Sequence, residues 1–312
     1  MWDNYPGIQA ELAAFEDYLK GKLANRIEFL RTATQGIVFS GGKRLRPAFT
    51  ILSAMQGNYS REKVFPAAAS VEILHAATLV HDDIIDNAKT RRGQLTVSEK
   101  HSVNLAVYTG DYMLAKSLSL LVETGLQPER LELVSKAITQ LCEGEVEQYL
   151  GKYELTTVNH YLKRIIRKTG ILFSVSCALG ARAGGLNDEE TRLLTRFGIS
   201  FGAAFQIRDD LLDILSDEQT EGKPVFNDLK EGIATLPIIM SAQRNPEIRK
   251  NVEELFEGTG DILSILRSVT SSGGVRESEK LKQKYTDKCR SYLKKLTPSS
   301  YTGALSDIVD WL

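Results

Sequence analysis

The sequence predicts an all-α protein that forms a single bundle of about ten or more helices and one domain over residues 1–312. Long segments rich in Ala and Leu show helical periodicity, and they lack the apolar and polar alternation that marks strands. Only eight prolines occur, mostly at expected helix starts or in loops, such as Pro47, Pro66 and Pro224. No stretch rich in Pro, Gly or Ser divides the chain.

Three predicted helices are long and apolar, and they cover residues 66–86, 103–125 and 189–215. Three loops accompany them. FSGGKRLRP (39–47) precedes a helix, NAKTRRGQLT (87–96) follows the first acid cluster, and SDEQTEGKPVFNDLKEGIATLP (216–237) follows the second. Each loop carries basic residues, so positive charge is expected beside the ends of these helices.

Two of these helices end in nearly the same cluster of acids, LVHDDIID and QIRDDLLD. In a helix, residues four apart share a face, with Cβ atoms roughly 5–6 Å apart. Asp82 therefore pairs with Asp86, and Asp209 pairs with Asp213. Clustered negative charge in apolar surroundings is costly unless a cation or hydrogen bonds neutralise it. Carboxylate oxygens suit Mg²⁺, which takes one or two carboxylates and completes its ligands with water or phosphate.

A single cluster of this kind could equally be a solvated helix face, since acids four apart on a helix are common. Two copies, 127 residues apart and both set in apolar sequence, favour the metal site. Asp83 and Asp210 complete the two clusters, and we count all six acids as candidate catalytic residues. The two acidic helices also suggest an internal duplication.

Composition excludes some classes of function. Lys and Arg number 39 and Asp and Glu 40, a net charge of −1, whereas general nucleic-acid binders carry a basic excess. Cys142, Cys177 and Cys289 are widely spaced and without a CxxC pattern, which indicates neither a disulfide framework nor a zinc site. No signal peptide is evident, and no uncharged apolar run approaches roughly 18 residues. We therefore expect a cytoplasmic protein.

The basic loops suit phosphate. Lys43 and Arg46 follow two glycines that allow close approach of the backbone to a ligand. Arg91 and Arg92 lie five and six residues after Asp86, so the chain leaving the helix could turn them back toward a bound metal. Arginine binds phosphate oxygens in a bidentate fork, and lysine supplies a point charge. Each alone is typical of a solvated surface, but together they favour an anion site beside each acid cluster.

Five motifs, in order and spacing, resemble the trans-prenyl diphosphate synthases of the polyprenyl synthetase family, medium- and long-chain bacterial type. They are GGKRLRP, HAATLVHDDIIDNAKTRRG, KTGILF, FQIRDDLLD and GKPVFNDLKEGIATLP, and they extend from Gly41 to Pro237. The resemblance implies an isoprenoid synthase fold with the two acid clusters facing each other across a central cavity. It also implies a Mg²⁺ set, held by Asp82, Asp86, Asp209 and Asp213, that bridges the diphosphate of an allylic substrate.

The resemblance further assigns the basic and polar positions. Residues implied to contact the allylic diphosphate are Arg91, Lys168, Thr169, Gln206 and Lys223. Residues implied to bind isopentenyl diphosphate, the homoallylic substrate, are Lys43, Arg46, His75 and Arg92. One position departs from the family pattern, because Ile233 stands where many relatives have lysine. More of the allylic contact would then rest on Lys168 and Lys223.

Product length is expected to depend on the helix leading into Asp82. Thr78, Ala77 and Leu74 lie four, five and eight residues upstream, about one and two turns below the metal on a similar face. Ala77 and Thr78 are small, which leaves the first turn open to a growing chain. DDIID also lacks the two-residue insertion of typical bacterial farnesyl synthases, which favours a medium- or long-chain product. Candidates for the floor are Leu74, Val71 and Met113.

The expected enzyme condenses isopentenyl diphosphate with an allylic primer, such as farnesyl diphosphate, to give an all-trans polyprenyl diphosphate for a quinone side chain. A short-chain farnesyl or geranylgeranyl synthase is the alternative. We expect a homodimer, or a heterodimer with a small accessory subunit as its catalytic member, no nucleic acid, and a product handed to the membrane. More distant alternatives are a class I terpene cyclase and an HD-type metal phosphohydrolase, the latter because His81 precedes Asp82.

Overall fold

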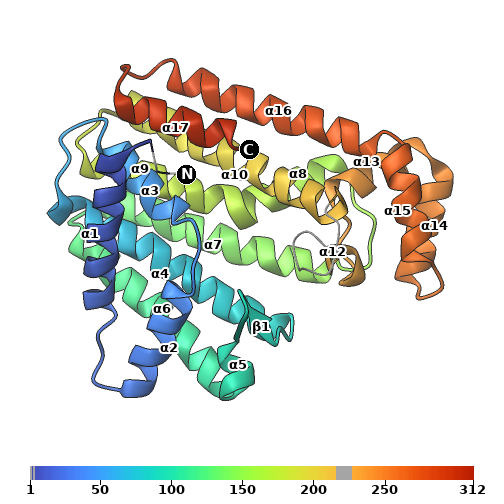
Figure 1. Cartoon of the computed structure of the whole chain (residues 1–312), viewed down its shortest axis with the longest axis horizontal. Coiled ribbons are helices and arrows are strands. Elements are labelled where there is room, and N and C mark those ends of the chain that lie inside the picture. Colours follow the sequence, from blue (N-terminus) through green and yellow to red (C-terminus); the bar gives the residue numbers. More distant parts are fainter. Residues whose placement is uncertain (1, 3, 216–226) are drawn as a thin grey trace. The chain divides into compact units, whose positions relative to one another are not determined.

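The computed structural model describes residues 2, 4–215 and 227–312, and this part of the chain is almost entirely α-helical (Figure 1). Its only strands, β1 (Thr90–Arg91) and β2 (Gln94–Leu95), form a short antiparallel hairpin. The first helices are α1 (Pro6–Lys22), α2 (Glu28–Phe39), α3 (Leu45–Ala54), α4 (Arg61–Ile85), α5 (Val97–Lys100) and α6 (Val103–Glu123).

The remaining helices include one π-helical turn, η1. They are α7 (Pro128–Leu150), α8 (Val158–Ile165), η1 (Ile166–Gly170), α9 (Ile171–Ala183), α10 (Asp188–Leu215), α12 (Asn227–Lys230), α13 (Leu236–Arg244), α14 (Pro246–Phe256), α15 (Ile262–Ser271), α16 (Gly274–Leu293) and α17 (Ser300–Asp310). The predicted all-α class is confirmed, and the loop predicted at 87–96 contains the hairpin.

The described residues form two compact units. Unit 1 comprises Met1–Val134, Val175–Thr195 and Leu296–Leu305, and unit 2 comprises Ser135–Ser174, Arg196–Lys295 and Ser306–Leu312. The first acid cluster belongs to unit 1 and the second to unit 2, and each is described within its own unit. A single domain over residues 1–312 stays a prediction.

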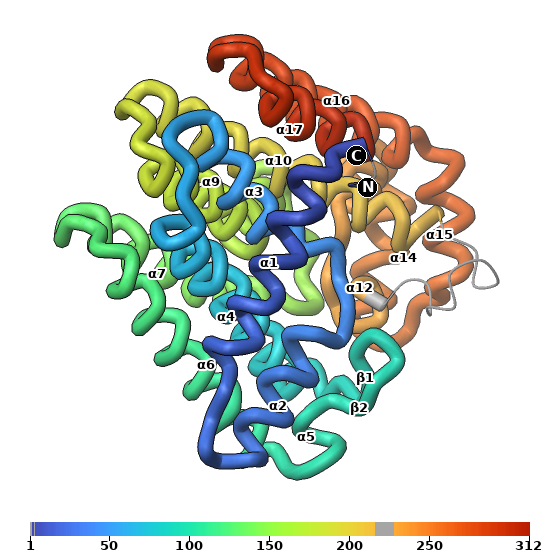
Figure 2. The backbone as a smooth tube through the Cα atoms, turned by 60° about the vertical axis from the view of Figure 1, so that its left-hand side comes forward, coloured from blue at the N-terminus to red at the C-terminus, as the bar shows by residue number. Residues whose placement is uncertain are grey.

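Helix α4 is the core of unit 1, and α6 and α3 pack along it (Figures 1 and 2). Ser70 of α4 and Ser117 of α6 each donate a hydrogen bond to the other's carbonyl oxygen, both at 2.9 Å. Gly180 lets α9 approach α3 closely, because a Cβ there would lie 2.0 Å from the carbonyl oxygen of Thr50. These contacts fix the helix that ends in the first acid cluster.

Among the described residues, α4 is the one helix long and apolar enough to cross a membrane. Its most apolar window has a mean hydropathy of 1.3, and 78% of that window is buried inside the protein. Burial against other helices is the arrangement of a core helix, which passes the same test of length and composition.

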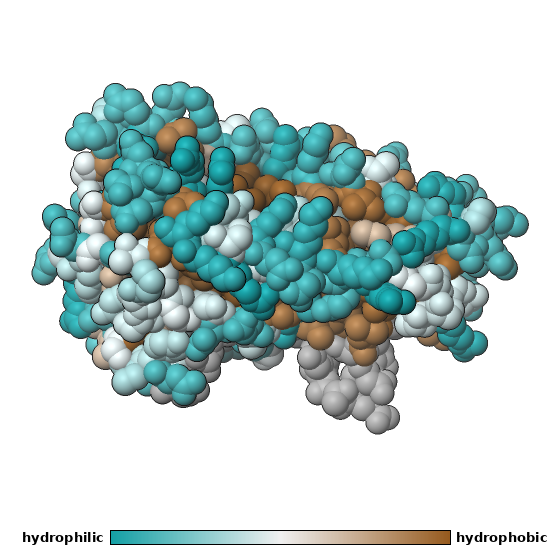
Figure 3. All heavy atoms as spheres, turned by 90° about the horizontal axis from the view of Figure 1, so that it is seen from above, coloured by the Kyte–Doolittle hydropathy of each residue, from teal (hydrophilic) through white to brown (hydrophobic). Residues whose placement is uncertain are grey.

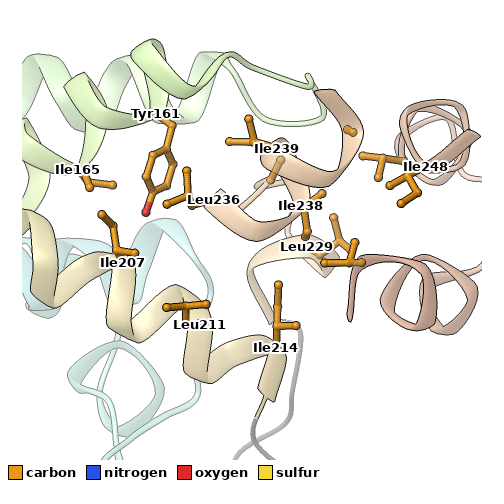
Figure 4. Close-up of a cluster of buried hydrophobic side chains, with 14 of the residues drawn as sticks. Tyr161, Ile165, Ile207, Leu211, Ile214, Leu229, Leu236, Ile238, Ile239 and Ile248 are labelled. Carbon is orange, nitrogen blue, oxygen red and sulfur yellow. The ribbon is translucent and has the colours of Figure 1, made fainter. Parts of the chain in front are cut away.

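A cluster of buried aliphatic side chains forms the core of unit 2 around the C-terminal half of α10. Tyr161 lies among Ile165, Ile207 and Leu236, with its ring inside this core (Figure 4). Because a buried phenol needs a hydrogen-bond partner, the position of Tyr161 predicts a buried acceptor close by.

Candidate active site

The first acid cluster lies at the C-terminal end of α4. The helix ends at Ile85, and the amide of Asp86 still donates to the carbonyl oxygen of Asp82 at 2.8 Å, so the two acids are one helical turn apart. A helix C-terminus carries partial negative charge, which makes it an unfavourable place for carboxylates unless a cation is bound. The local geometry thus supports the cation site that the spacing predicts.

The middle acid of this cluster is held differently. Asp83 is buried, and its Oδ1 accepts a hydrogen bond from Nε of Arg91 at 2.7 Å. Burial raises the pKa of the Asp83 carboxyl, and Arg91 opposes that shift. Arg91, which the family resemblance assigns to the allylic diphosphate, therefore neutralises a carboxylate of the protein in this structure.

The hairpin brings Arg91 back to the helix. Arg92 and Gly93 form the two-residue turn between β1 and β2, with φ of 51° and 76°. Positive φ at both central residues is the geometry of a type I′ turn. Thr96 then donates from its hydroxyl to the carbonyl oxygen of Ala88 at 2.8 Å, which closes the base of the loop. The chain does turn back beyond Asp86, as the sequence predicts.

The glycine-rich loop before α3 holds the second arginine of the hairpin. Gly41 and Gly42 have φ of 112° and 117°, and a Cβ on Gly42 would lie 3.0 Å from the Arg92 guanidinium. Arg92 also donates to the carbonyl oxygen of Gly41. Lys43, the next residue, is exposed. The structure thus brings together the loop and Arg92, both predicted to bind isopentenyl diphosphate.

Arg46 and His75, both half-buried, belong to the same basic group. Burial lowers the pKa of Arg46 to about 10, and Arg92 lowers it further while Glu72 opposes the shift. The pKa of His75 falls well below its usual value, first because of burial and then because of Arg46 and Arg92. Positive charge is thus crowded around His75, an arrangement that favours a bound anion.

Glu72 is a residue that the sequence analysis missed. It is buried on α4, three residues before His75, and its Oε1 lies 3.0 Å from Nη1 of Arg44. Arg44 also contacts Glu16 of α1 at 3.0 Å, and its φ is 49° at the N-terminus of α3. A lone acid inside the apolar run AAASVEILHAA was the available signal, because buried carboxylates are rare unless paired.

The second acid cluster lies in the last turns of α10, and its middle acid is again buried. Asp210 Oδ2 accepts a hydrogen bond from the Tyr161 hydroxyl at 2.6 Å, and Oδ1 accepts from the Gln206 side chain at 3.0 Å. The backbone amide of Leu236 adds a third at 3.4 Å. Burial raises the pKa of Asp210, and these hydrogen bonds oppose the shift. Every one of these donors is uncharged.

The two clusters therefore share one arrangement. In each, the middle acid turns into the protein, while the outer acids occupy positions four residues apart on the helix. The outer acid Asp209 is accessible and has Arg208 at 3.9 Å. Among the described residues, no three His, Cys, Asp or Glu side chains are grouped to hold a metal ion. A pair of carboxylates completed by water and phosphate is the donor set that Mg²⁺ uses most often.

A π-helical turn positions the next predicted residues. Thr169, within η1, donates from its hydroxyl to Gln206 Oε1 at 2.9 Å, and Gln206 in turn donates to Asp210. Lys168 lies beside Glu145, with 3.1 Å between Nζ and Oε2. Short π-helical turns are frequent at functional sites. Thr169 and Gln206 are thus part of the network that holds the second cluster.

Asp228 is a second residue that the sequence analysis missed. It lies in α12, and its pKa is raised to about 7 by burial and then by Asp210 and Asp213, while Lys168 opposes the shift. Ile233, the position that departs from the family pattern, is buried and donates its amide to the carbonyl oxygen of Asp228 at 2.8 Å. The predicted Lys223 falls outside the described residues.

The predicted chain-length residues lie where α4 packs in unit 1. Ala77 and Leu74 are buried, with 2% and 5% exposure, and Met113 of α6 and Val71 are almost completely buried. Thr78 is half-buried, and its hydroxyl donates to the carbonyl oxygen of His75 at 2.8 Å. The side chain accessible one turn below Asp82 is therefore that of Thr78, not Ala77.

The histidines do not form an HD-type site among the described residues. His81 Nε2 lies 3.4 Å from Asp111 Oδ1, and its ring packs on Gly110, where a Cβ would lie 2.3 Å from Nε2. His101 packs edge-on against Phe29, with ring centroids 5.0 Å apart. His81 supports α4 against α6.

Comparison with known proteins identifies the family of the chain. The sequence pattern of the polyprenyl synthetase family matches residues 27–269. Component 2 of heptaprenyl diphosphate synthase from Geobacillus stearothermophilus is 35% identical over 307 residues, which cover 97% of this chain and 95% of the relative. The chain belongs to the polyprenyl synthetase family.

Solved structures extend the likeness to the fold. Heptaprenyl diphosphate synthase from Staphylococcus aureus has a TM-score of 0.91 and 32% identity, over 97% of this chain and 96% of that chain. Polyprenyl synthase from Caulobacter crescentus, complexed with calcium and isoprenyl diphosphate, has a TM-score of 0.89 and 28% identity. The match covers 97% of this chain and 94% of that chain. Geranylgeranyl diphosphate synthases also match.

The family, the isoprenoid synthase fold and the trans-prenyltransferase activity predicted from the sequence are confirmed. Heptaprenyl, nonaprenyl and decaprenyl diphosphate synthases among the relatives support a medium- or long-chain polyprenyl product. The terpene cyclase and HD-type alternatives are set aside, because neither belongs to this family.

Proposed function

We propose that the enzyme condenses isopentenyl diphosphate with an allylic diphosphate, with farnesyl diphosphate as primer, in a Mg²⁺-dependent reaction. The carbon–oxygen bond of the allylic substrate breaks, and its electron pair leaves with diphosphate. The double bond of isopentenyl diphosphate attacks the allylic cation, and loss of a proton gives an allylic diphosphate five carbons longer. The observation that carries the proposal is the repeated DDxxD cluster at the ends of two helices, in which the outer acids lie one helical turn apart and the middle acid is held by the protein.

The outer acids Asp82, Asp86, Asp209 and Asp213 fit Mg²⁺, because they offer only carboxylate oxygens. When bound, the metal would neutralise charge on the leaving diphosphate. The relative from Caulobacter crescentus binds calcium and isoprenyl diphosphate, which supports a divalent cation beside a diphosphate. Asp83 and Asp210, predicted as catalytic, would act by positioning, since each is engaged with protein donors.

The basic residues supply two diphosphate sites. Lys43, Arg46, His75 and Arg92 would bind isopentenyl diphosphate, and their support is the cation-rich group around His75. Arg91, Lys168, Thr169, Gln206 and Lys223 would bind the allylic diphosphate. Basic groups aimed at the leaving oxygens stabilise charge as it develops, which is the main catalytic effect expected here.

Product length would be set beside Thr78, Ala77 and Leu74. Because Thr78 is accessible and Ala77 is packed, Thr78→Tyr should shorten the product toward farnesyl or geranylgeranyl diphosphate with little loss of stability. Ala77→Tyr should also shorten it but carry a cost of roughly 1–3 kcal/mol for overpacking. Leu74→Ala should lengthen or broaden the distribution. Chromatography of dephosphorylated products measures this, and unchanged lengths in both Tyr variants would contradict it.

The same proposal covers the wider setting. The enzyme would act in the cytoplasm as a single-domain protein, bind no nucleic acid, and supply the side chain of a quinone. It would be a homodimer, or the catalytic member of a heterodimer with a small accessory subunit. The name "component 2" carried by two relatives supports a partner.

The direct test is product analysis of the purified protein with Mg²⁺, isopentenyl diphosphate and farnesyl diphosphate. We expect an all-trans polyprenyl diphosphate longer than geranylgeranyl diphosphate, and no product when EDTA removes the metal. A product that stops at geranylgeranyl diphosphate would favour the short-chain alternative. Activity that survives EDTA would contradict the role given to the outer acids.

A further inference from the structure

A basic stripe runs along the exposed face of α16 and the two residues after it. The side chains that form it are all exposed, and they are Arg276, Lys280, Lys284, Lys288, Lys294 and Lys295. The first four follow one another at intervals of four residues, so they lie along one ridge of the helix. None of them belongs to the candidate active site.

The stripe is unusually positive for this chain. Residues 274–295 contain eight Lys and Arg against three Asp and Glu, a net charge of +5, whereas the whole chain carries −1. The rest of the chain therefore carries −6. Each acid of α16 already pairs with a base: Glu277 with Lys280 at 2.9 Å, Glu279 with Lys282 at 2.7 Å, and Asp287 with Arg290 at 3.0 Å. Lys280 is one of these paired bases, and Arg290 also pairs with Asp310 of α17 at 2.8 Å. The excess positive charge of the stripe therefore rests on its other residues, which are exposed.

The shape of this face suits small polar groups. A shallow groove on α16 is lined by Lys280, Gln283, Lys284, Asp287, Lys288 and Ser291. No large exposed apolar side chain of the described residues belongs to α16. Figure 3 looks onto the side where α16 lies in Figure 1, and hydrophilic side chains cover much of that face. Lys is depleted at protein interfaces, which rely on aromatic and aliphatic anchors that this helix lacks.

We propose that the basic stripe of α16 docks the enzyme on a membrane surface rich in anionic phospholipid headgroups. Clusters of four to eight Lys and Arg on a helix are attracted to the negative potential of such surfaces. The product of the reaction also favours this partner, because each added five-carbon unit increases the preference of the tail for a bilayer over water. Docking would bring the enzyme to the phase that accepts its product.

The test measures binding of the whole protein to vesicles without substrate, so its result is independent of the proposed activity. Sedimentation with vesicles of equal parts phosphatidylglycerol and phosphatidylcholine is compared with vesicles of phosphatidylcholine alone, at low and high salt. The test variant is Lys284→Glu/Lys288→Glu. The matched control is Lys20→Glu/Lys63→Glu, which makes the same charge change at exposed positions of α1 and α4.

We expect wild type and control to bind the anionic vesicles at low salt, to leave them at high salt, and to ignore the neutral ones. The Lys284→Glu/Lys288→Glu variant should partition at least about tenfold less strongly. No sedimentation of wild type at low salt, equal binding to neutral vesicles, or equal losses in the two double variants would overturn the proposal. The proposal would also be overturned if the stripe bound an acidic protein and the enzyme did not bind vesicles at all.

Discussion

The two acid clusters share the pattern DDxxD, yet their middle acids are held in opposite ways. Asp83 is paired with the charged side chain of Arg91, which comes from a hairpin at the surface. Asp210 is held by Tyr161 and Gln206, which are uncharged and belong to or border the core of unit 2. The first cluster depends on an ion pair that salt and substrate phosphate compete with, and the second on hydrogen bonds inside the core.

This difference shows that two kinds of structure can support the same sequence motif. The outer acids should behave alike in both clusters, because in each cluster they lie one helical turn apart. The middle acids should behave differently, because one supports a loop and the other supports a core. Each expectation can be measured.

The largest effect is expected from the outer acids. Asp82→Ala and Asp209→Ala should each reduce turnover by roughly 10³-fold or more while leaving the fold intact, because each removes a ligand that acts chiefly in the transition state. Steady-state kinetics with circular dichroism measures both effects, and Asp17→Ala on the exposed face of α1 is the control. Near-normal turnover in either variant would show that the clusters are not equivalent metal sites.

A smaller effect should separate the two diphosphate sites. Arg46→Ala should raise KM for isopentenyl diphosphate about 10- to 100-fold and change KM for the allylic substrate much less, because a lost phosphate contact is worth about 1.5–3 kcal/mol. Lys168→Ala should do the reverse. Initial rates with each substrate varied in turn are the measurement. Equal changes in both KM values would contradict two separate basic sites.

Removal of the middle acids should affect stability unequally. Asp210→Ala leaves the buried Tyr161 hydroxyl without its acceptor, which should lower the free energy of unfolding by about 1–3 kcal/mol. Asp83→Ala should cost about 1 kcal/mol or less, because the Arg91 side chain is 35% exposed and can be solvated. Urea unfolding at low and high salt measures both. The loss of stability in Asp83→Ala should become smaller at high salt. If the loss in Asp210→Ala also became smaller, this would argue against support of Asp210 by uncharged hydrogen-bond donors.

The second cluster should also respond to pH through Asp228. Its folded pKa of about 7 lies above the ordinary value of 3.8, so it contributes stability that is complete below about 4 and is lost as pH rises through 7. The Asp228→Asn variant has no carboxyl group to ionise. Measured in EDTA, its free energy of unfolding should rise relative to that of wild type by roughly 2–4 kcal/mol between pH 4 and pH 8. Parallel pH profiles of unfolding for variant and wild type would contradict the raised pKa.

Much of the fold and the outer acids could be predicted from local sequence. Spacing of four residues places Asp82 with Asp86 and Asp209 with Asp213 on any helix, and apolar periodicity identifies α4, α6 and α10. The loop after Asp86 was predicted to return toward the acids, and the turn at Arg92 and Gly93 accomplishes this. These features depend on neighbours within a few residues.

The supports of the site could not be predicted, because they come from distant parts of the chain. Tyr161 meets Asp210 across 49 residues, and Arg44 meets Glu72 across 28. The raised pKa of Asp228 depends on burial among other acids, which only tertiary packing creates. Ala77 is expected from its size to leave the first turn open, but the packing around α4 buries it, so a small residue indicates close packing as readily as a cavity.

The most direct test is the Mg²⁺ dependence of single-turnover rates in four variants, Asp82→Asn, Asp83→Asn, Asp209→Asn and Asp210→Asn. If only the outer acids bind metal, the Mg²⁺ concentration for half-maximal rate should rise at least about tenfold in the Asp82 and Asp209 variants, since a tenfold change corresponds to about 1.4 kcal/mol of lost ligand binding. It should stay near the wild-type value in the Asp83 and Asp210 variants, even where their rates fall. An equal rise in all four variants would contradict the division between outer acids that bind metal and middle acids that bind the protein.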